Sequence, residues 1–269
     1  MSRPWAFALL VPALAVLTFF LAIPLVNLLV TSFHAYSSTL GVTTRWTFEN
    51  YTRFLFDRFY IDVLVRTLRV GLETTALCVV MGYPVALFLQ QTRGAARNWL
   101  TLLLLSPLLV SMVIRAYGWV IILGRNGPVP LYTEGAIIIG LVHVSLAYMV
   151  LPILASLEQI EPSVLRAAAS LGASPFTTFR RVTLPLTFPG LLAGCVIVFS
   201  LSVSAFVTPS ILGGTRVKLL STYIYDQVVS LLNWPYGSAI GFVLIAVSTI
   251  SLLIFSRVLR RSHTDVVLG

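Results

Sequence analysis

The sequence predicts an all-α membrane protein with six transmembrane helices and a bent helical loop between the fourth and fifth. Of its 269 residues, 58% are hydrophobic and only 10% are charged. A soluble domain carries roughly 25% charged residues. The hydrophobic residues also gather in six long runs. Such a chain cannot cover itself with a surface that water tolerates, so we expect the lipid bilayer to surround it.

Each of the six runs is long enough to cross a bilayer, which takes about 20 apolar residues. The predicted spans cover residues 5–33, 64–90, 99–123, 136–157, 188–212 and 238–259. The first run is too long for a cleaved signal sequence and contains Pro12, Pro24 and Asn27, so we interpret it as a retained span. We expect residues 1–269 to form a single transmembrane domain.

The basic residues flank the apolar runs and form no cluster of the kind that binds nucleic acid, despite a net charge of +9. An even number of spans places both termini on one side of the membrane. Basic residues are nearly balanced between the two sides, but the short loop 91–98 and the tail around Arg257, Arg260 and Arg261 favour cytoplasmic termini. The outer segment 34–62 mixes aromatic and charged residues, which predicts an interfacial helix at the headgroups.

The loop between spans four and five, residues 161–185, has the pattern of two short helices joined by a sharp bend. Pro162 suits a first helical turn, and an Ala- and Leu-rich stretch follows it. Gly172 is placed to end that helix with a positive φ angle, and Ser174 can cap the next helix ahead of Pro175. We expect the second helix, about 175–182, to stop before Pro185.

The surface of this loop suits a partner protein. Ala167, Ala168 and Ala169 leave a helical face without bulky side chains, which another surface can approach closely. Arg180 and Arg181 can contact acidic groups or helix C-termini of that partner. A rigid bent element that joins two spans and docks on a moving partner could transmit motion into the membrane.

The loop resembles the signature loop of binding-protein-dependent ABC permeases, the type I importer family. That pattern is Glu-Ala-Ala, three residues, Gly, nine residues, then Ile-x-Leu-Pro. Here the matching residues are Arg166-Ala167-Ala168, Gly172, and Val182-Thr183-Leu184-Pro185. The spacing agrees throughout, and the departure is Arg166 where the family usually has Glu, which leaves one partner contact open.

The resemblance implies a non-catalytic permease of the bacterial inner membrane. Its expected partners are a sister permease, two ATP-binding-cassette ATPase subunits and a periplasmic substrate-binding protein. It also implies that the partner ATPases use ATP and Mg and that this chain binds no cofactor. The residues expected to couple it to the ATPases are Arg166, Ala167, Ala168, Gly172, Arg180, Arg181, Leu184 and Pro185.

Further segments are similar to the spermidine/putrescine branch of that family. They are Gly82-Tyr83-Pro84, the run 114–119, Leu212-Gly213-Gly214 and the run 234–239. The branch also includes carriers of other small solutes. The resemblance therefore implies a polyamine, with an amino-acid derivative, an opine-like compound or a phosphonate as alternatives.

Two charged residues fall within predicted spans, Glu73 and Arg115. Charge inside a bilayer is costly and often functional, so both are candidates for the substrate pathway. The alternatives are a structural ion pair or, for Arg115, a side chain that reaches the outer interface. An anionic or zwitterionic substrate would use Arg115.

A cationic amine would need carboxylates and aromatic faces. Asp226, which lies among tyrosines beyond span five, is the leading candidate for a cation contact. Tyr223, Trp119 and Trp234 are further candidates. The alternative for Asp226 is a solvated loop residue beside interfacial tyrosines, and His143 in span four is expected to be a packed polar residue.

Other classes of protein are less well supported. The chain has no Gly-x-x-x-x-Gly-Lys-Ser/Thr sequence to bind ATP and no His-Glu-x-x-His sequence to bind zinc. Cys78 and Cys195 lie inside apolar runs without a neighbouring ligand, so no metal site is predicted. An ion-coupled secondary transporter remains the alternative, although no internal repeat is evident.

Overall fold

The computed structural model describes residues 11–12, 14–124, 127 and 129–268, and most of them are helical. The chain divides into two compact units. Unit 1 comprises Met1–Leu64 and Leu220–Ala246, and unit 2 comprises Val65–Leu219 and Val247–Gly269. Helices α4 (Arg58–Gln91) and α13 (Trp234–Leu268) each contribute residues to both units.

Unit 1 contains a small hairpin that the sequence analysis did not predict. The elements lying wholly within it are η1 (Thr18–Ala22), α2 (Ile23–Ser32), β1 (His34–Ser37), β2 (Gly41–Trp46), α3 (Glu49–Phe56), α12 (Leu220–Tyr225) and η3 (Asp226–Ser230). Strands β1 and β2 pair in antiparallel fashion, and Gly41 turns the chain with a φ of 73°. Within 34–62, helical structure is found in α3 and in the first residues of α4. Asn50 of α3 donates to the carbonyl of Ser32 at the end of α2 and to that of His34 at the start of β1.

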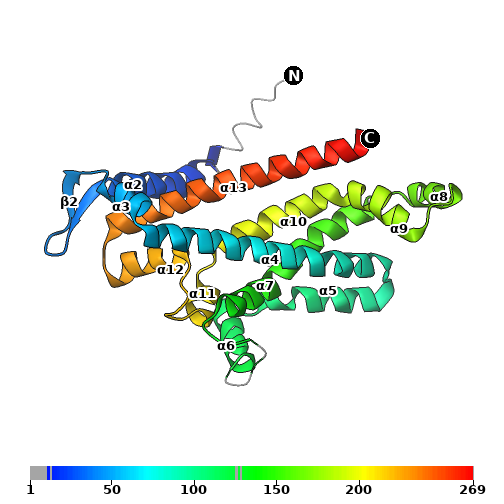
Figure 1. Cartoon of the computed structure of the whole chain (residues 1–269), viewed down its shortest axis with the longest axis horizontal. Coiled ribbons are helices and arrows are strands. Elements are labelled where there is room, and N and C mark those ends of the chain that lie inside the picture. The colour runs from blue at the N-terminus through cyan, green and yellow to red at the C-terminus, as the bar shows by residue number, and fades with distance from the viewer. Residues whose placement is uncertain (1–10, 13, 125–126, 128, 269) are drawn as a thin grey trace. The chain divides into compact units, whose positions relative to one another are not determined.

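Unit 2 contains the remaining elements. They are α5 (Gly94–Leu109), α6 (Met112–Ile122), α7 (Glu134–Glu158), α8 (Pro162–Ser170), α9 (Pro175–Thr178), η2 (Phe179–Thr183), α10 (Leu184–Ser204) and α11 (Val207–Leu212). Helices α7 and α10 run alongside each other, with α8 and α9 at one end of the pair and α6 and α11 at the other (Figure 1).

Close packing of α7 against α10 forms the centre of unit 2. Met149, Ile153 and Val198 are fully buried there. A Cβ atom at Gly190 would lie only 2.2 Å from the carbonyl oxygen of Pro152. Small residues that allow backbones to approach closely are typical of helix interfaces in membranes.

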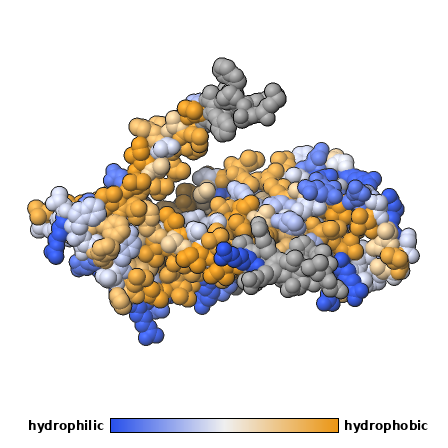
Figure 2. Space-filling model, turned by 90° about the horizontal axis from the view of Figure 1, so that it is seen from above, coloured by the Kyte–Doolittle hydropathy of each residue, from blue (hydrophilic) through white to orange (hydrophobic). Residues whose placement is uncertain are grey.

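Among the described residues, five helices are long and apolar enough to cross a membrane, or up to six spans if a bent helix pair counts as one. The five are Leu14–Ser32, Arg58–Gln91, Glu134–Glu158, Pro175–Ser204 and Trp234–Ile254. Residues 5–10 and 13 of the first predicted span lie outside the described residues. Figure 2 shows hydrophobic residues over much of the visible surface, which suits a chain solvated by lipid.

The predicted third span, 99–123, is not one straight helix. It consists of α5 and α6, which are bent by 100° at Val110 and Ser111. The predicted fifth span, 188–212, is also divided, because the helix breaks at Ala205 and Phe206 before α11. These two breaks lie within stretches that the sequence analysis treated as single apolar runs, although Pro107 and Arg115 fall in the first of them.

The second helix of the loop does not stop before Pro185 as expected. Helical structure continues from α9 through η2 into α10, and Pro185 lies in the first turn of α10. The turn η2 is of the π type, in which the N–H group of Leu184 bonds to the carbonyl of Phe179. This wide turn changes the bonding pattern ahead of Pro185, so the missing N–H group of proline does not end the helix.

Candidate functional site

A tight turn joins the short helices α8 and α9. Gly172 has a φ of 79°, as the sequence predicted. Its N–H group donates to Ala169, and the N–H group of Ala173 donates to Ala168. These two bonds form a Schellman motif that satisfies the last carbonyls of α8. Ser174 then caps α9, because its hydroxyl oxygen accepts from the N–H group of Thr177 at 3.3 Å.

The surface of this helix pair is exposed. No residue of α8 or α9 is buried. Leu171 is 88% exposed and Phe176 is 71% exposed. Arg166, Arg180 and Arg181 are exposed as well. The pair therefore presents two large apolar side chains among cationic ones, at the end of the α7–α10 pair (Figure 1).

Contacts that the sequence analysis did not find attach this exposed pair to the rest of unit 2. Phe179 in η2 packs edge-on against Tyr83 of α4, with ring centroids 5.5 Å apart. The hydroxyl oxygens of Tyr83 and Thr187 lie 2.6 Å apart. Leu184, one of the predicted coupling residues, packs against the buried core. A displacement of α9 would therefore also move α4 and α10.

Polar contacts also link the neighbouring helix ends. Gln90 of α4 donates to the carbonyl of Leu157 at 2.9 Å, near the C-terminus of α7. Arg97 of α5 forms an ion pair with Glu158, the last residue of α7. Because these partners are more than 60 residues apart in the chain, local sequence patterns could not reveal them.

Of the predicted pathway residues, Glu73 belongs to an ion cluster on unit 2. Its carboxylate lies 3.8 Å from Arg69, which also pairs with Glu134. Arg66 contacts the same Glu134 at 3.2 Å. Glu73 is exposed. This geometry matches the alternative of a structural ion pair.

Three other predicted pathway residues belong to unit 1. Tyr223 of α12 packs edge-on against Phe59 at 5.3 Å between ring centroids. Asp226 begins η3 and is half-buried, and Trp234 begins α13 with 45% of its surface exposed. Tyr223 in α12 and Asp226 in η3 therefore lie about one helical turn apart in one continuous helical segment.

Arg115 lies at the break between α5 and α6. Its guanidinium reaches back across the bend and donates to the carbonyl oxygen of Pro107 in the last turn of α5. Helix ends leave carbonyls without intrahelical partners, so Arg115 supplies a donor that the broken helix lacks. Among the described residues, the four ion pairs involve Arg66, Arg69 and Arg97 as cations, and Arg115 takes part in none.

A cavity of about 370 Å³ opens beside Arg115, where both helix breaks meet. Its polar lining comes from Arg115 of α6, Ser145 and Tyr148 of α7, Ser204 at the end of α10, and Thr208 of α11. Irregular backbone at membrane depth is tolerated where it is buried in protein or lines a cavity. The two breaks that the sequence concealed therefore border the same space.

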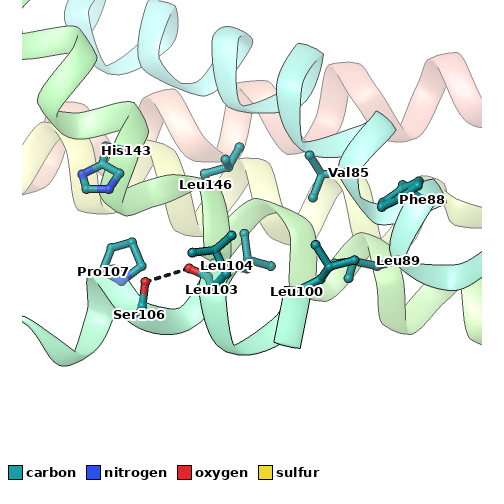
Figure 3. Close-up of a pocket in the computed structure, with 10 residues that line it drawn as sticks. All are labelled: Val85, Phe88, Leu89, Leu100, Leu103, Leu104, Ser106, Pro107, His143 and Leu146. Atoms are coloured by element: carbon teal, nitrogen blue, oxygen red, sulfur yellow. Dashed lines mark hydrogen bonds between the residues drawn. The ribbon is translucent and has the colours of Figure 1, made fainter. Parts of the chain in front are cut away.

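A second, more apolar cavity of about 360 Å³ lies between α4, α5 and α7 (Figure 3). Pro107 and His143 both border it. Because Pro107 has no N–H group to bond to the carbonyl of Leu103, the hydroxyl of Ser106 donates to that carbonyl instead. His143 is exposed, contrary to the expectation of a packed residue, and its Nδ1 accepts a bond from Trp119 of α6 at 3.1 Å. Trp119 is thereby fixed beside this second cavity.

In the described part of the chain, no group of three or more His, Cys, Asp or Glu side chains could hold a metal ion.

Comparison with known sequences places this geometry in context. Residues 78–264 match a protein family described as "binding-protein-dependent transport system inner membrane component". The spermidine/putrescine transport system permease protein PotB of Escherichia coli (strain K12) is 34% identical over 259 residues, covering 91% of this chain and 94% of that protein. PotB of Haemophilus influenzae is 33% identical, covering 90% of this chain and 89% of that protein.

Solved structures show the same fold. The chain resembles a bacterial ABC transporter involved in the import of the acidic polysaccharide alginate, with a TM-score of 0.74 and 20% identity over 96% of this chain and 95% of that one. The alginate transporter in complex with an alginate pentasaccharide-bound periplasmic protein gives a TM-score of 0.76 and 19% identity, with the same coverage. At this level of identity the likeness concerns the fold alone.

Proposed function

We propose, because the chain belongs to the family of binding-protein-dependent transport system inner membrane components, that it forms part of the import pathway for a polyamine such as putrescine or spermidine. The chain is a multi-pass permease subunit of the ABC importer type. The observation that supports a polyamine is the similarity to spermidine/putrescine permeases, which extends over nearly the whole chain.

The exposed α8–α9 pair is the proposed contact with the ATPases. Leu171 and Phe176 would enter a groove on an ATPase subunit, and Arg166, Arg180 and Arg181 would contact its acidic groups. Covering two large, water-exposed apolar side chains with a partner surface lowers the free energy and so stabilises the complex. ATP and Mg would bind to the ATPases, with no cofactor on this chain.

The proposed assembly contains this chain, a sister permease, two ATPase subunits and a periplasmic binding protein. Residues 1–269 would act as one transmembrane domain of six spans, with both termini and the α8–α9 pair on the cytoplasmic side of the inner membrane. Closure of the ATPases around ATP would draw the α8–α9 pairs of the two permeases together. Phe179 and Tyr83 would carry that motion into α4 and open the pathway outward.

The proposed pathway includes the cavity beside Arg115 and the candidates Trp119, Tyr223, Asp226 and Trp234. The carboxylate of Asp226 and the aromatic faces suit the ammonium groups of a polyamine. Glu73 is a further candidate, and a polyamine would have to compete with Arg69 for its carboxylate.

A second substrate class is favoured by one observation. Among the described residues that line the cavity, Arg115 alone carries a charge, and a guanidinium binds carboxylates or phosphonates. An amino-acid derivative, an opine-like compound or a phosphonate is therefore the alternative solute.

Uptake by reconstituted vesicles tests the proposal. The complete complex should import labelled putrescine in the presence of ATP and the binding protein, and a labelled amino-acid derivative should enter far more slowly. Vesicles that contain the permeases without ATPase subunits should import neither. Uptake by those vesicles under an ion gradient would instead indicate a secondary transporter, and preference for the amino-acid derivative would favour the second substrate class.

A further inference from the structure

The guanidinium of Arg115 binds the carbonyl oxygen of Pro107, a position that would also suit a substrate cation. The carbonyl end of a helix carries a partial negative charge and favours cations. At the break after α5 this end lies beside the cavity, which Leu108 of α5 and Arg115 of α6 both line. The guanidinium therefore holds a carbonyl that an ammonium group could equally hold.

Among the residues that the structure describes, no carboxylate forms an ion pair with Arg115. The four ion pairs among the described residues leave it out, and its contact is to a neutral carbonyl. A charge-assisted bond to a neutral acceptor can be exchanged for another without leaving a buried anion unpaired. A cation that enters the cavity also repels Arg115, because few charges intervene to screen the pair.

We infer that Arg115 is a displaceable internal cation, whose guanidinium holds the Pro107 carbonyl until an ammonium group of the substrate takes its place. This inference rests on the proposed polyamine substrate. Arg115 then acts as a positioning and specificity residue, because a substrate without a cationic group cannot replace it.

The consequence of displacement falls on the bend between α5 and α6. Arg115 belongs to α6 and Pro107 to α5, so their bond holds the two helices at their 100° angle. Pro107 also borders the second cavity, so the last turn of α5 contributes residues to both cavities (Figure 3). Exchange of guanidinium for ammonium would therefore free this turn to move between the two cavities while substrate is bound.

Binding of labelled putrescine to the purified permease–ATPase complex in nanodiscs, without the binding protein, tests the inference. Arg115→Gln should lower the dissociation constant about tenfold, because the competing cation is gone. Arg115→Lys should stay close to the wild type. Arg93→Gln removes an exposed charge at the start of the same bent pair and should change nothing. An unchanged or raised dissociation constant for Arg115→Gln would overturn the inference.

A second measurement uses the wild-type complex and so does not depend on the folding of a variant. Phenylglyoxal modifies accessible guanidinium groups, and mass spectrometry reports the modification of Arg115. Saturating putrescine should raise its rate several-fold by releasing the guanidinium, whereas protection by putrescine would overturn the inference. If the wild-type complex neither binds nor imports putrescine, the proposed substrate fails and this inference fails with it. If it imports putrescine but Arg115→Gln binds no more tightly, the inference alone fails.

Discussion

The hydroxyl oxygens of Tyr83 and Thr187 lie 2.6 Å apart and join α4 to the first turn of α10. The ring of Tyr83 also packs against Phe179, which precedes α10 in the π-type turn η2. Tyr83 thus contacts the helical segment that follows α9 at two residues, Phe179 and Thr187. If the α8–α9 pair transmits motion, Tyr83 is the first residue outside that segment to receive it.

Tyr83→Phe should destabilise the protein modestly and weaken coupling. The hydroxyl contact is worth about 0.6–1.7 kcal/mol by comparison with other hydrogen bonds between helices in membranes. Thermal unfolding in detergent measures the loss, and the ratio of ATP hydrolysed to putrescine imported measures coupling. Tyr117→Phe, which alters a 57% exposed tyrosine, is the matched control. A Tyr83→Phe variant with an unaltered ratio would remove Tyr83 from the transmission route.

Gly172→Asp should uncouple ATP hydrolysis from transport. A side chain at a φ of 79° strains the backbone, at a cost of about 1–2 kcal/mol, although a Cβ atom there meets nothing within 4 Å. The strain would distort the turn between α8 and α9. Gly41→Asp is a stringent control, because Gly41 has a φ of 73°, equal open space, and a place in the hairpin. Import at the wild-type rate by Gly172→Asp would show that the turn has no coupling role.

Leu171→Asp should prevent the ATPases from binding while leaving the fold intact. Leu171 is 88% exposed, so a charge there disturbs no internal packing. Co-purification of tagged ATPase with the permease measures the interaction. Leu40→Asp, at a position 80% exposed in the hairpin of unit 1, should retain the ATPase. Equal recovery of ATPase with both variants would place the docking surface elsewhere.

Gly190→Ala should destabilise unit 2 strongly. The new methyl group would lie 2.2 Å from the Pro152 carbonyl and 2.3 Å from the Ser156 hydroxyl, forcing α7 and α10 apart at a cost of about 1–3 kcal/mol. Gly118→Ala meets nothing within 4 Å and lies inside α6, so it should be neutral or slightly stabilising. Thermal unfolding of the two variants under the same detergent conditions compares them directly, and equal midpoints would contradict the close packing.

Much of the helical architecture could be predicted from apolar runs, and the turn at Gly172 from local backbone chemistry. The break after α5 could not. Pro84, Pro152 and Pro189 all lie inside continuous helices, whereas Pro107 precedes a bend of 100°. A proline in an apolar run therefore does not by itself indicate whether the span continues. At this break the bond from Arg115 to the Pro107 carbonyl replaces lost helical bonding, and that contact is tertiary.

The contacts of the candidate pathway residues were harder to predict than the bend between α8 and α9. The geometry of that bend depends on consecutive residues, so local spacing alone can predict it. Partners such as Glu134 for Arg69 come from distant segments, and their pairing depends on how α4 packs beside α7. The hairpin was not predicted for a different reason. The aromatic and charged residues of 34–62 indicated an interfacial helix, and the β-branched run Val42-Thr43-Thr44, which favours a strand, was not considered.

The π-type turn η2 accommodates one extra residue between the α8–α9 pair and α10. Such a turn holds one residue more than an α-helical turn would. Each residue of an α-helix rotates the chain by about 100°, from 3.6 residues per turn. An α-helical path through Phe179–Thr183 would rotate Leu171 and Phe176 around the axis of α10 by that amount for the extra residue, and the wider turn avoids this rotation. Deletion of one residue here would restore an ordinary helical turn and leave the direction of the exposed α8–α9 surface nearly unchanged, so it should be better tolerated than insertion of a further residue.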